Sequence, residues 1–251
     1  MTDLDNLRVV LVQTRNPLNI GAAARAMSNF GVLRLRVVNP YEAAFREARS
    51  AVGASALLTK AEKYDGVAEA VGDCKLIVGT TVAGPRRDLQ HPLHRLDNGA
   101  RTIKRQLKDG PVALLFGSER YGLSNEELSH CHWLMRIPTR EEHGSMNLGQ
   151  AVAVCLYEVV RRAPTAMPTT TAPQKKEKTP ATSGDVERVT QSLFDVLSAS
   201  GYVKPRAAAA TEENLRRMIR RMKLNSNDTD MWLGMLRQMA WKLGATKKNN
   251  K

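Results

Sequence analysis

The sequence predicts an α/β protein: a mostly parallel β-sheet covered by helices on both faces, in a three-layer arrangement, followed by a small all-α module. Three observations support this fold class. Short apolar runs alternate with helical segments, those runs are continuously apolar, and the composition changes abruptly near residue 162. Continuous apolar runs are typical of parallel strands buried on both faces, and the alternation of strands with helices is typical of three-layer α/β domains.

The expected strands are LRVVLVQ (7–13), LRLRVVN (33–39), KLIVGTT (75–81), VALLFGS (112–118) and WLMRIP (133–138). The first expected helix, residues 19–31, has apolar residues near one face and ends at Gly31, a residue type common just after a helix. Further helices are expected at 41–49, around 64–72, at 125–129 and at 148–162.

A linker separates two predicted domains. Residues 163–184 contain four prolines and six threonines and have no apolar periodicity, which is typical of a linker. We therefore expect a catalytic domain at 1–163, a linker at 164–184 and a helical module at 185–251. In the module, amphipathic helices are expected at 185–203, 210–225 and 228–244. Asp185 and Thr211 are candidate N-caps, and Gly201 and Gly244 are candidate helix ends.

The charge distribution indicates a polyanionic partner. The formal net charge is +13. Residues 1–163 carry 22 Lys and Arg against 17 Asp and Glu, whereas the shorter remainder carries 16 against 8. A solvated basic face is one explanation, but clustering favours nucleic acid over a membrane surface. The predicted RNA-binding residues, on the module's second helix, are Arg216, Arg217, Arg220, Arg221 and Lys223.

Several classes of protein are disfavoured. The three cysteines show no C-x-x-C spacing, which implies no disulfide framework, and His130 to His132 are too close in sequence to converge on one metal ion. The N-terminus lacks a signal-like apolar run, and no apolar stretch is long enough to span a membrane. We expect a cytoplasmic protein with no metal and no membrane association. Dinucleotide-binding, phosphate-loop, zinc-protease and nucleophile-elbow motifs are absent.

Three polar stretches follow predicted strands: TRNPLNIGAAARAM, LLFGSERYGLSNEEL and IPTREEHGSMNLGQAVAVCLYE. Ligands of open α/β sheets gather at the carboxyl ends of strands. The candidate site residues are Asn19, Arg25, Glu119, Ser145 and Asn147. Each has a simpler explanation: Asn19, Ser145 and Asn147 could be helix caps, Arg25 a surface charge and Glu119 an exposed acid. The residues alone do not name the reaction.

Taken in order, the three stretches resemble the three motifs of the SpoU (TrmH-like) branch of the SPOUT RNA 2′-O-ribose methyltransferases. The resemblance covers roughly residues 7–163. The C-terminal segments LFDVLSASGYV and LRRMIRRM resemble the tail of TrmJ-type members, which methylate the 2′-oxygen of anticodon-loop nucleotide 32 of tRNA.

The resemblance implies S-adenosyl-L-methionine as methyl donor, a tRNA substrate, a homodimer and a deep trefoil knot. Arg25, Glu119, Ser145 and Asn147, supported by Asn19, would form the catalytic cluster. A guanidinium is not readily deprotonated, so we expect Arg25 to bind phosphate and stabilise the developing 2′-alkoxide. The implied cofactor-binding residues are Thr80, Thr81, Val82, Gly117, Ile137, Gly144, Ser145 and Met146.

Three alternatives remain open. The target could be another tRNA position or a ribosomal RNA ribose, because catalytic motifs do not separate these. The protein could bind RNA without catalysis. A basic α/β phosphohydrolase is the third alternative, although phosphate-loop and metal-carboxylate motifs are missing.

Overall fold

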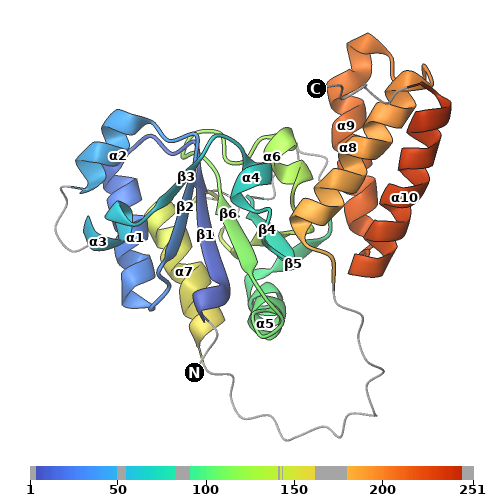
Figure 1. The fold of residues 1–251 in the computed structure, drawn as a ribbon. Coiled ribbons are helices and arrows are strands. Elements are labelled where there is room, and N and C mark those ends of the chain that lie inside the picture. The colour runs from blue at the N-terminus through green and yellow to red at the C-terminus, as the bar shows by residue number, and fades with distance from the viewer. Residues whose placement is uncertain are drawn as a thin grey trace, which may run out of the picture. The chain divides into compact units, whose positions relative to one another are not determined.

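The computed structural model describes residues 4–49, 55–82, 91–140, 142, 144–161 and 180–244. The chain divides into two compact units, residues 1–169 and 170–251, which are described separately below (Figure 1). The division falls within the predicted linker. Residues 164–179 of that linker lie outside the described residues.

The first unit contains a seven-stranded sheet with the order β3-β2-β1-β6-β4-β7-β5. Every strand pairing in it is parallel. The five predicted strands are confirmed as β1 (Leu7–Val12), β2 (Arg34–Val38), β4 (Leu76–Thr80), β6 (Val112–Phe116) and β7 (Trp133–Arg136). Two short edge strands were not predicted, β3 (Glu62–Tyr64) and β5 (Leu93–Arg95). Their polar, three-residue sequences contain no apolar run that could have identified them.

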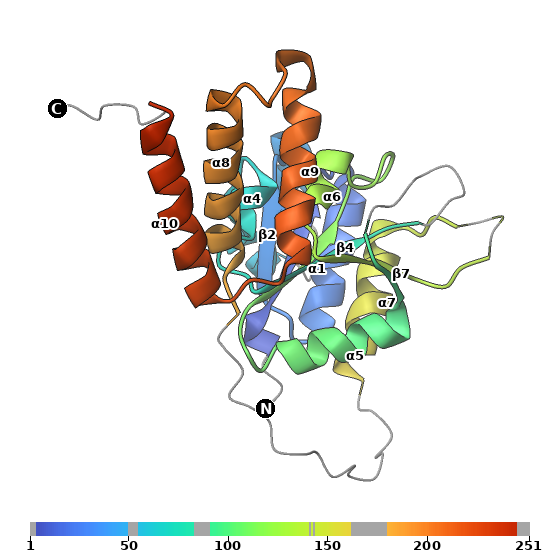
Figure 2. The same cartoon turned by 90° about the vertical axis from the view of Figure 1, so that its right-hand side faces the viewer.

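Helices cover both faces of the sheet, which confirms the three-layer prediction (Figures 1 and 2). Along β1, Val9 and Leu11 face one layer and Val10 and Val12 face the other. The first layer is formed by α1 (Pro17–Asn29), α2 (Glu42–Arg49), α3 (Ser55–Thr59), α5 (Leu96–Gln106) and α7 (Leu148–Val160). The second is formed by α4 (Val67–Ala70) and α6 (Asn125–Ser129).

Helices α3 and α5 were not predicted. The sequence of α5 did not predict a helix, because it contains three residues of low helix propensity, Asp97, Asn98 and Gly99. Its buried residues Leu96, Ala100 and Ile103 nevertheless follow the i, i+4, i+7 spacing of an amphipathic helix. That spacing was the available signal.

Helices α1 and α7 pack closely because small residues meet at their contact. A Cβ atom added to Gly149 would lie 2.5 Å from the Cβ of Ala22, closer than real Cβ contacts allow. This close approach places the N-terminal ends of the two helices side by side, and both carry predicted site residues. The predicted trefoil knot stays a prediction from the resemblance.

The first unit also contains a buried charge. Arg36 on β2 is 8% exposed, and its guanidinium binds Glu62, Asp73 and the carbonyl of Ala70. The partners compensate for the cost of removing the cation from water. Burial of Asp73 opposes its charge, but the hydrogen bond and charge of Arg36 outweigh this effect and lower the pKa of the carboxyl.

The second unit is a bundle of α8 (Ser183–Ala199), α9 (Ala208–Arg221) and α10 (Ser226–Lys242) around an apolar core (Figure 2). The predicted helix ends are confirmed, since Gly201 and Gly244 have φ values of 79° and 67°. The predicted N-caps are wrong. Thr182 caps α8, with Asp185 completing the capping box, and α9 begins before Thr211. The described part of the module therefore starts inside the predicted linker.

Candidate active site

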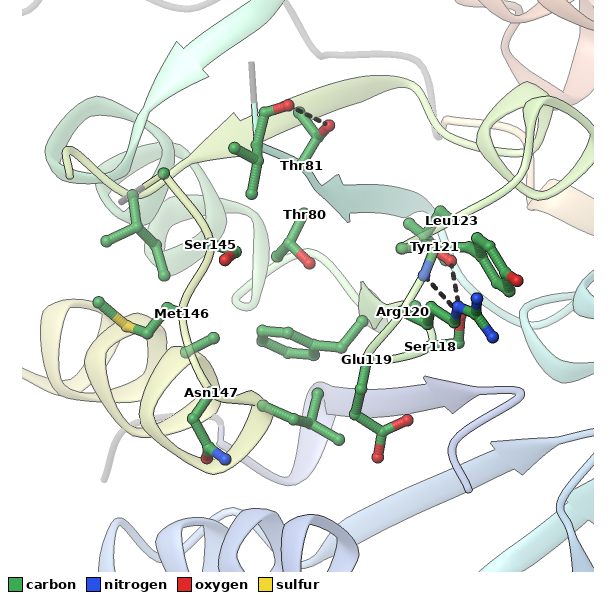
Figure 3. A pocket seen from close by; sticks show the side chains of 18 of the residues that line it. Thr80, Thr81, Ser118, Glu119, Arg120, Tyr121, Leu123, Ser145, Met146 and Asn147 are labelled. Atoms are coloured by element: carbon green, nitrogen blue, oxygen red, sulfur yellow. Dashed lines mark hydrogen bonds between the residues drawn. The ribbon is translucent and has the colours of Figure 1, made fainter. Parts of the chain in front are cut away.

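A cavity of about 590 Å³ lies beyond the carboxyl ends of β4, β6 and β7 (Figure 3). Three segments form most of its wall: residues 80–82 after β4, residues 116–123 at the end of β6, and residues between 135 and 151 around the start of α7. All eight predicted cofactor-binding residues line it. Four of the five predicted catalytic residues do so as well, namely Asn19, Glu119, Ser145 and Asn147.

Glu119 ties the loop after β6 to the start of α1. Its carboxylate accepts hydrogen bonds from the backbone N–H groups of Arg15 and Asn16, at 3.3 and 3.2 Å. It also accepts one from the side-chain amide of Asn19, at 3.2 Å. Glu119 is exposed, yet it is not a plain surface acid, because three donors from one segment fix its position.

The cap of α1 is Asn16, so the simpler explanation for Asn19 as a helix cap is wrong. The side chain of Asn16 accepts from the N–H of Leu18 at 2.9 Å, and Pro17 follows it at the first helical position. Asn19 lies within the first turn, and its amide group is directed to Glu119 and Asn147.

Asn147 serves two purposes at the start of α7. Its Oδ1 accepts from the N–H groups of Gly149 and Gln150, which caps the helix. Its Nδ2 donates to Oδ1 of Asn19 at 2.7 Å. A continuous set of hydrogen bonds therefore joins the three polar stretches in the order Glu119, Asn19, Asn147. Because Asn147 provides the cap, the exposed Ser145 is not needed for it.

The loop after β6 forms a tight turn. Ser118 and Gly122 pair through two backbone hydrogen bonds of 3.2 and 2.8 Å, and Gly122 has a φ of 67°. Gly117 packs directly beneath this turn. A Cβ at Gly117 would lie 2.1 Å from the carbonyl carbon of Gly122 and 2.3 Å from the nitrogen of Leu123. Glycine is therefore required at 117 for the turn to close.

Threonine hydroxyls hold two other parts of the wall. Thr80 donates to the carbonyl of Leu115 at 2.8 Å, which links the end of β4 to β6. Thr139 donates to the carbonyl of Gly144 at 3.0 Å, across the turn that precedes α7. Residues 80–82 and 144–146, next to these bonds, line the cavity.

Arg25 is the predicted catalytic residue that the fold does not bring to this cavity. It is exposed on α1 and does not line the pocket. Six residues along an α-helix correspond to a rotation of about 240°, so Arg25 and Asn19 lie on different faces of α1. Within one chain, Arg25 therefore stands apart from Glu119 and Asn147.

Sequence reasoning missed several residues of the wall. Ser118, Arg120, Tyr121 and Leu123 belong to the turn, and they lie within the stretch that supplied Glu119 (Figure 3). Their place between Gly117 and the next helix was the available signal. Apolar residues of the strands and of α7 complete the lining, namely Phe116, Met135, Leu148 and Ala151.

The predicted RNA-binding cluster of α9 is not a uniform exposed face. Arg216 and Arg220 are 7% and 4% exposed, and both pair with Glu187 of α8, at 2.8 and 3.6 Å. Arg217 pairs with Glu213 at 3.0 Å. Three of the five predicted RNA-binding residues therefore bind glutamates inside the unit, and RNA binding by the five stays a prediction. Arg221 and Lys223 are exposed.

Within the described ranges, no group of three or more His, Cys, Asp or Glu side chains is placed to hold a metal ion. None of the helices described is long and apolar enough to cross a membrane. Cys74, Cys131 and Cys155 are buried, and none of the three forms a disulfide. Burial raises the pKa of the Cys155 thiol to about 12.

The sequence matches a family model described as the SpoU rRNA Methylase family over residues 6–157. It is 36% identical over 235 residues to the tRNA (cytidine/uridine-2′-O-)-methyltransferase TrmJ of Sodalis glossinidius, covering 93% of this chain and 91% of the relative. It is 37% identical over 237 residues to the protein of the same name from Yersinia pestis (strain Pestoides F), with the same two coverages.

The fold is similar to the crystal structure of TrmJ from Z. mobilis ZM4, with a TM-score of 0.79 and 31% sequence identity. The similarity covers 92% of this chain and 98% of that chain. The similarity therefore extends over both units, because residues 1–169 alone make up less than 92% of the chain.

Proposed function

Since the chain belongs to the SpoU rRNA methylase family, we propose that it methylates the 2′-oxygen of a ribose in tRNA, with S-adenosyl-L-methionine as donor. One observation carries this proposal. The hydrogen bonds from Glu119 through Asn19 to Asn147 join the family's three motif stretches around one cavity. The relatives from Sodalis and Yersinia, which are named as tRNA 2′-O-methyltransferases, support the choice of reaction and substrate.

The cavity is suited to an adenosine-type cofactor. Its volume of about 590 Å³ lies within the range of about 300–1,000 Å³ that is usual for ligand pockets. Its wall combines apolar residues such as Leu123, Met135 and Leu148 with small or polar residues that follow the strand ends. Thr80 to Val82, Gly117, Ile137 and Gly144 to Met146 would hold the cofactor. Its sulfonium supplies an already activated methyl group.

The residues of this chain then act mainly by alignment. Ser145 and Asn147 would orient the ribose at the cavity. Glu119 holds the start of α1 in place, including Asn19, which contacts Asn147. Alignment of oxygen, methyl carbon and sulfur accounts for a large part of such a rate enhancement. The hydroxyl proton leaves to a phosphate oxygen or to water. A guanidinium is already protonated at neutral pH, so the side chain of Arg25 is unsuited to accept this proton.

Arg25 enters the site through a homodimer. It is exposed and does not line the cavity of its own chain, so we place it in the cavity of a second copy, where its charge stabilises the developing alkoxide. Exposed apolar side chains on α1 and α7, Leu18 at 78% and Tyr157 at 55% exposure, support a subunit contact on this layer. Sedimentation showing a monomer at working concentration would contradict this arrangement.

The proposed target is nucleotide 32 of the tRNA anticodon loop, by resemblance to TrmJ-type enzymes. The second unit would bind the phosphate backbone through its exposed cations, which include Arg221 at the end of α9 and Lys223 just after it. The excess of cations over anions in residues 164–251 supports this role.

The test is methyl transfer from labelled S-adenosyl-L-methionine to unmodified total tRNA and to ribosomal RNA. The modified ribose is mapped by its resistance to alkaline cleavage. Protection of a single linkage at nucleotide 32 is expected. Protection elsewhere in tRNA or in ribosomal RNA would keep the reaction and overturn the target. An absence of transfer to either RNA would overturn the proposed function.

A further inference from the structure

A second cavity, of about 610 Å³, adjoins the candidate active site. Its lining comes from the segment after β1 and from the turn after β6. Ser118, Glu119, Arg120 and Tyr121 line both cavities, so this one turn forms a wall of each. The remaining lining residues are Gln13, Arg15, Asn16 and Pro17.

Tyr121 stands out on that wall. Its side chain is 74% exposed although it is a large aromatic residue beside the catalytic cluster. The turn fixes the backbone of Tyr121. Its N–H donates to the hydroxyl of Ser118 at 3.3 Å, and the Ser118–Gly122 pair closes the turn. The guanidinium of Arg120 lies 5.1 Å from the centre of the Tyr121 ring (Figure 3).

The position of the ribose limits how far the base of the target nucleotide can lie from the first cavity. A ribose whose 2′-oxygen reaches the first cavity carries its base within one nucleotide's length, and the second cavity is the neighbouring space across the shared turn. Bases of RNA loops are recognised unstacked, and they stack on aromatic rings and arginine planes of the protein. Arg120 and Tyr121 provide both kinds of surface on the wall that the two cavities share, and the exposed Arg15 adds a cation that could contact the RNA backbone.

We propose that the second cavity receives the base of the nucleotide being methylated, and that Tyr121, backed by Arg120, is the surface on which this base stacks. The inference rests on the proposed function and adds a base-binding site to it. Stacking tolerates either pyrimidine, because every base has a π-face. Tyr121 thus contributes affinity and positioning and leaves the choice between cytidine and uridine to other contacts.

The test is a double-mutant cycle on a stem-loop RNA that contains the ribose located by the mapping experiment. The stem-loop is used intact and with the base of the target nucleotide removed, which leaves the 2′-hydroxyl in place. Wild type, Tyr121→Ala and Tyr121→Trp are compared, with Tyr41→Ala as matched control. Tyr41 is 56% exposed and lines neither cavity.

On intact RNA, Tyr121→Ala is expected to lower kcat/KM roughly 5- to 150-fold, the range for loss of one base–aromatic stack, and Tyr121→Trp to retain most of it. On the RNA without the base, Tyr121→Ala and wild type should be nearly equal. If Tyr121→Ala instead lowers kcat/KM by the same factor on RNA with and without the base, the proposal is wrong. Weaker binding of S-adenosyl-L-methionine to Tyr121→Ala in a calorimetric titration would also overturn it, because that result would assign Tyr121 to the cofactor site.

Failure of the inference and failure of the proposed function give different results. If the wild type methylates the intact stem-loop and Tyr121→Ala does so equally well, the base-binding role is wrong and the function stands. If the wild type transfers no methyl group to any RNA, both fall. Because Tyr121 is exposed and its backbone bonds do not depend on its ring, all variants are expected to fold.

Discussion

Asn147 donates a hydrogen bond of 2.7 Å to Asn19, a residue 128 positions earlier in the chain. The bond joins the N-cap of α7 to the first turn of α1, and it exists because Gly149 and Ala22 let these helices approach closely. The same Asn147 side chain caps α7 through its oxygen. A single amide therefore stabilises a helix with one atom and holds the site together with the other.

Asn147→Asp should separate these two contributions. Aspartate caps helices about as well as asparagine, so the free energy of unfolding is expected to change by less than about 0.5 kcal/mol. The carboxylate would, however, face the acceptor Oδ1 of Asn19, whose amide nitrogen is engaged by Glu119. Methyl transfer should fall at least about 10-fold, the equivalent of about 1.4 kcal/mol. Urea unfolding and initial rates measure the two effects.

The control for that experiment is Asn29→Asp, at the exposed last residue of α1. It adds the same charge away from the cavity and should leave transfer unchanged. Equal loss of activity in both variants would mean that added charge, and not the bond to Asn19, is responsible.

Gly117→Ala should disrupt the turn after β6. The added methyl group would overlap the backbone of Gly122 and Leu123, and backbone atoms cannot move aside as a flexible side chain can. We expect a loss of about 1–3 kcal/mol or more in unfolding free energy and greatly weakened binding of S-adenosyl-L-methionine. Gly72→Ala is the control, because its nearest contacts would be at an ordinary 3.5 Å. Cofactor affinity unchanged in Gly117→Ala would show that the turn is not part of the cofactor site.

Arg25 is expected to act across the dimer. Arg25→Ala and Glu119→Ala should each abolish transfer, and Arg25→Ala should still bind the cofactor. Mixing the two inactive proteins under conditions of subunit exchange should restore about a quarter of wild-type activity, because half the dimers are mixed and one site in each is intact. No recovery in mixtures shown to contain mixed dimers would place Arg25 and Glu119 in the same chain's site.

The cations of α9 should fall into two groups. Glu187→Gln removes the charge that compensates buried Arg216 and Arg220, so it should destabilise the second unit by about 3–5 kcal/mol. Arg221→Ala and Lys223→Ala should leave stability within about 0.5 kcal/mol, because both side chains are exposed. Each should instead weaken tRNA binding. Thermal unfolding of the full chain and binding titrations distinguish the two groups.

The salt dependence of tRNA binding provides a second readout for Arg221 and Lys223. Loss of one phosphate contact lowers the slope of log K against log salt by about 0.7–0.9. Unchanged affinity and slope in both variants would remove α9 from the RNA-binding surface.

Acid should destabilise the first unit through Asp73. The pKa of Asp73 is lower in the folded protein than its ordinary value, since Arg36 outweighs the effect of burial. The native state therefore holds this proton less readily than the unfolded state. The resulting stability is fully present above the ordinary carboxyl pKa of about 4 and is lost as the pH falls through the folded value. Unfolding free energy measured between pH 7 and pH 2 should decline in this window.

Asp73→Asn should be less stable than wild type at neutral pH and should show a shallower decline in acid. Replacement of the exposed Asp195, on α8, by Asn serves as the comparison. An acid profile of Asp73→Asn that parallels the wild type would assign the decline to other carboxylates.

Local patterns in the sequence were sufficient for the elements that are long and apolar. The five buried strands, α1, α7 and the three helices of the second unit have strong periodicity or continuous apolar runs, which few other structures can accommodate. The strands β3 and β5 lack such runs, and they exist because neighbouring strands β2 and β7 supply partners. The three motif stretches supplied five predicted catalytic residues, and four of these line the cavity.

Other properties depended on tertiary contacts. From the sequence alone, Asn19 could be a helix cap and Glu119 an exposed acid. They are hydrogen-bonded partners because distant segments approach each other in the fold. Arg216 and Arg220 resemble surface cations in the sequence, but the packing of α9 on α8 buries them against Glu187. The exposure of Tyr121 beside a shared cavity wall has no sequence signature either. Sequence periodicity reports which face of an element avoids water, whereas the partner found by each polar side chain depends on long-range packing.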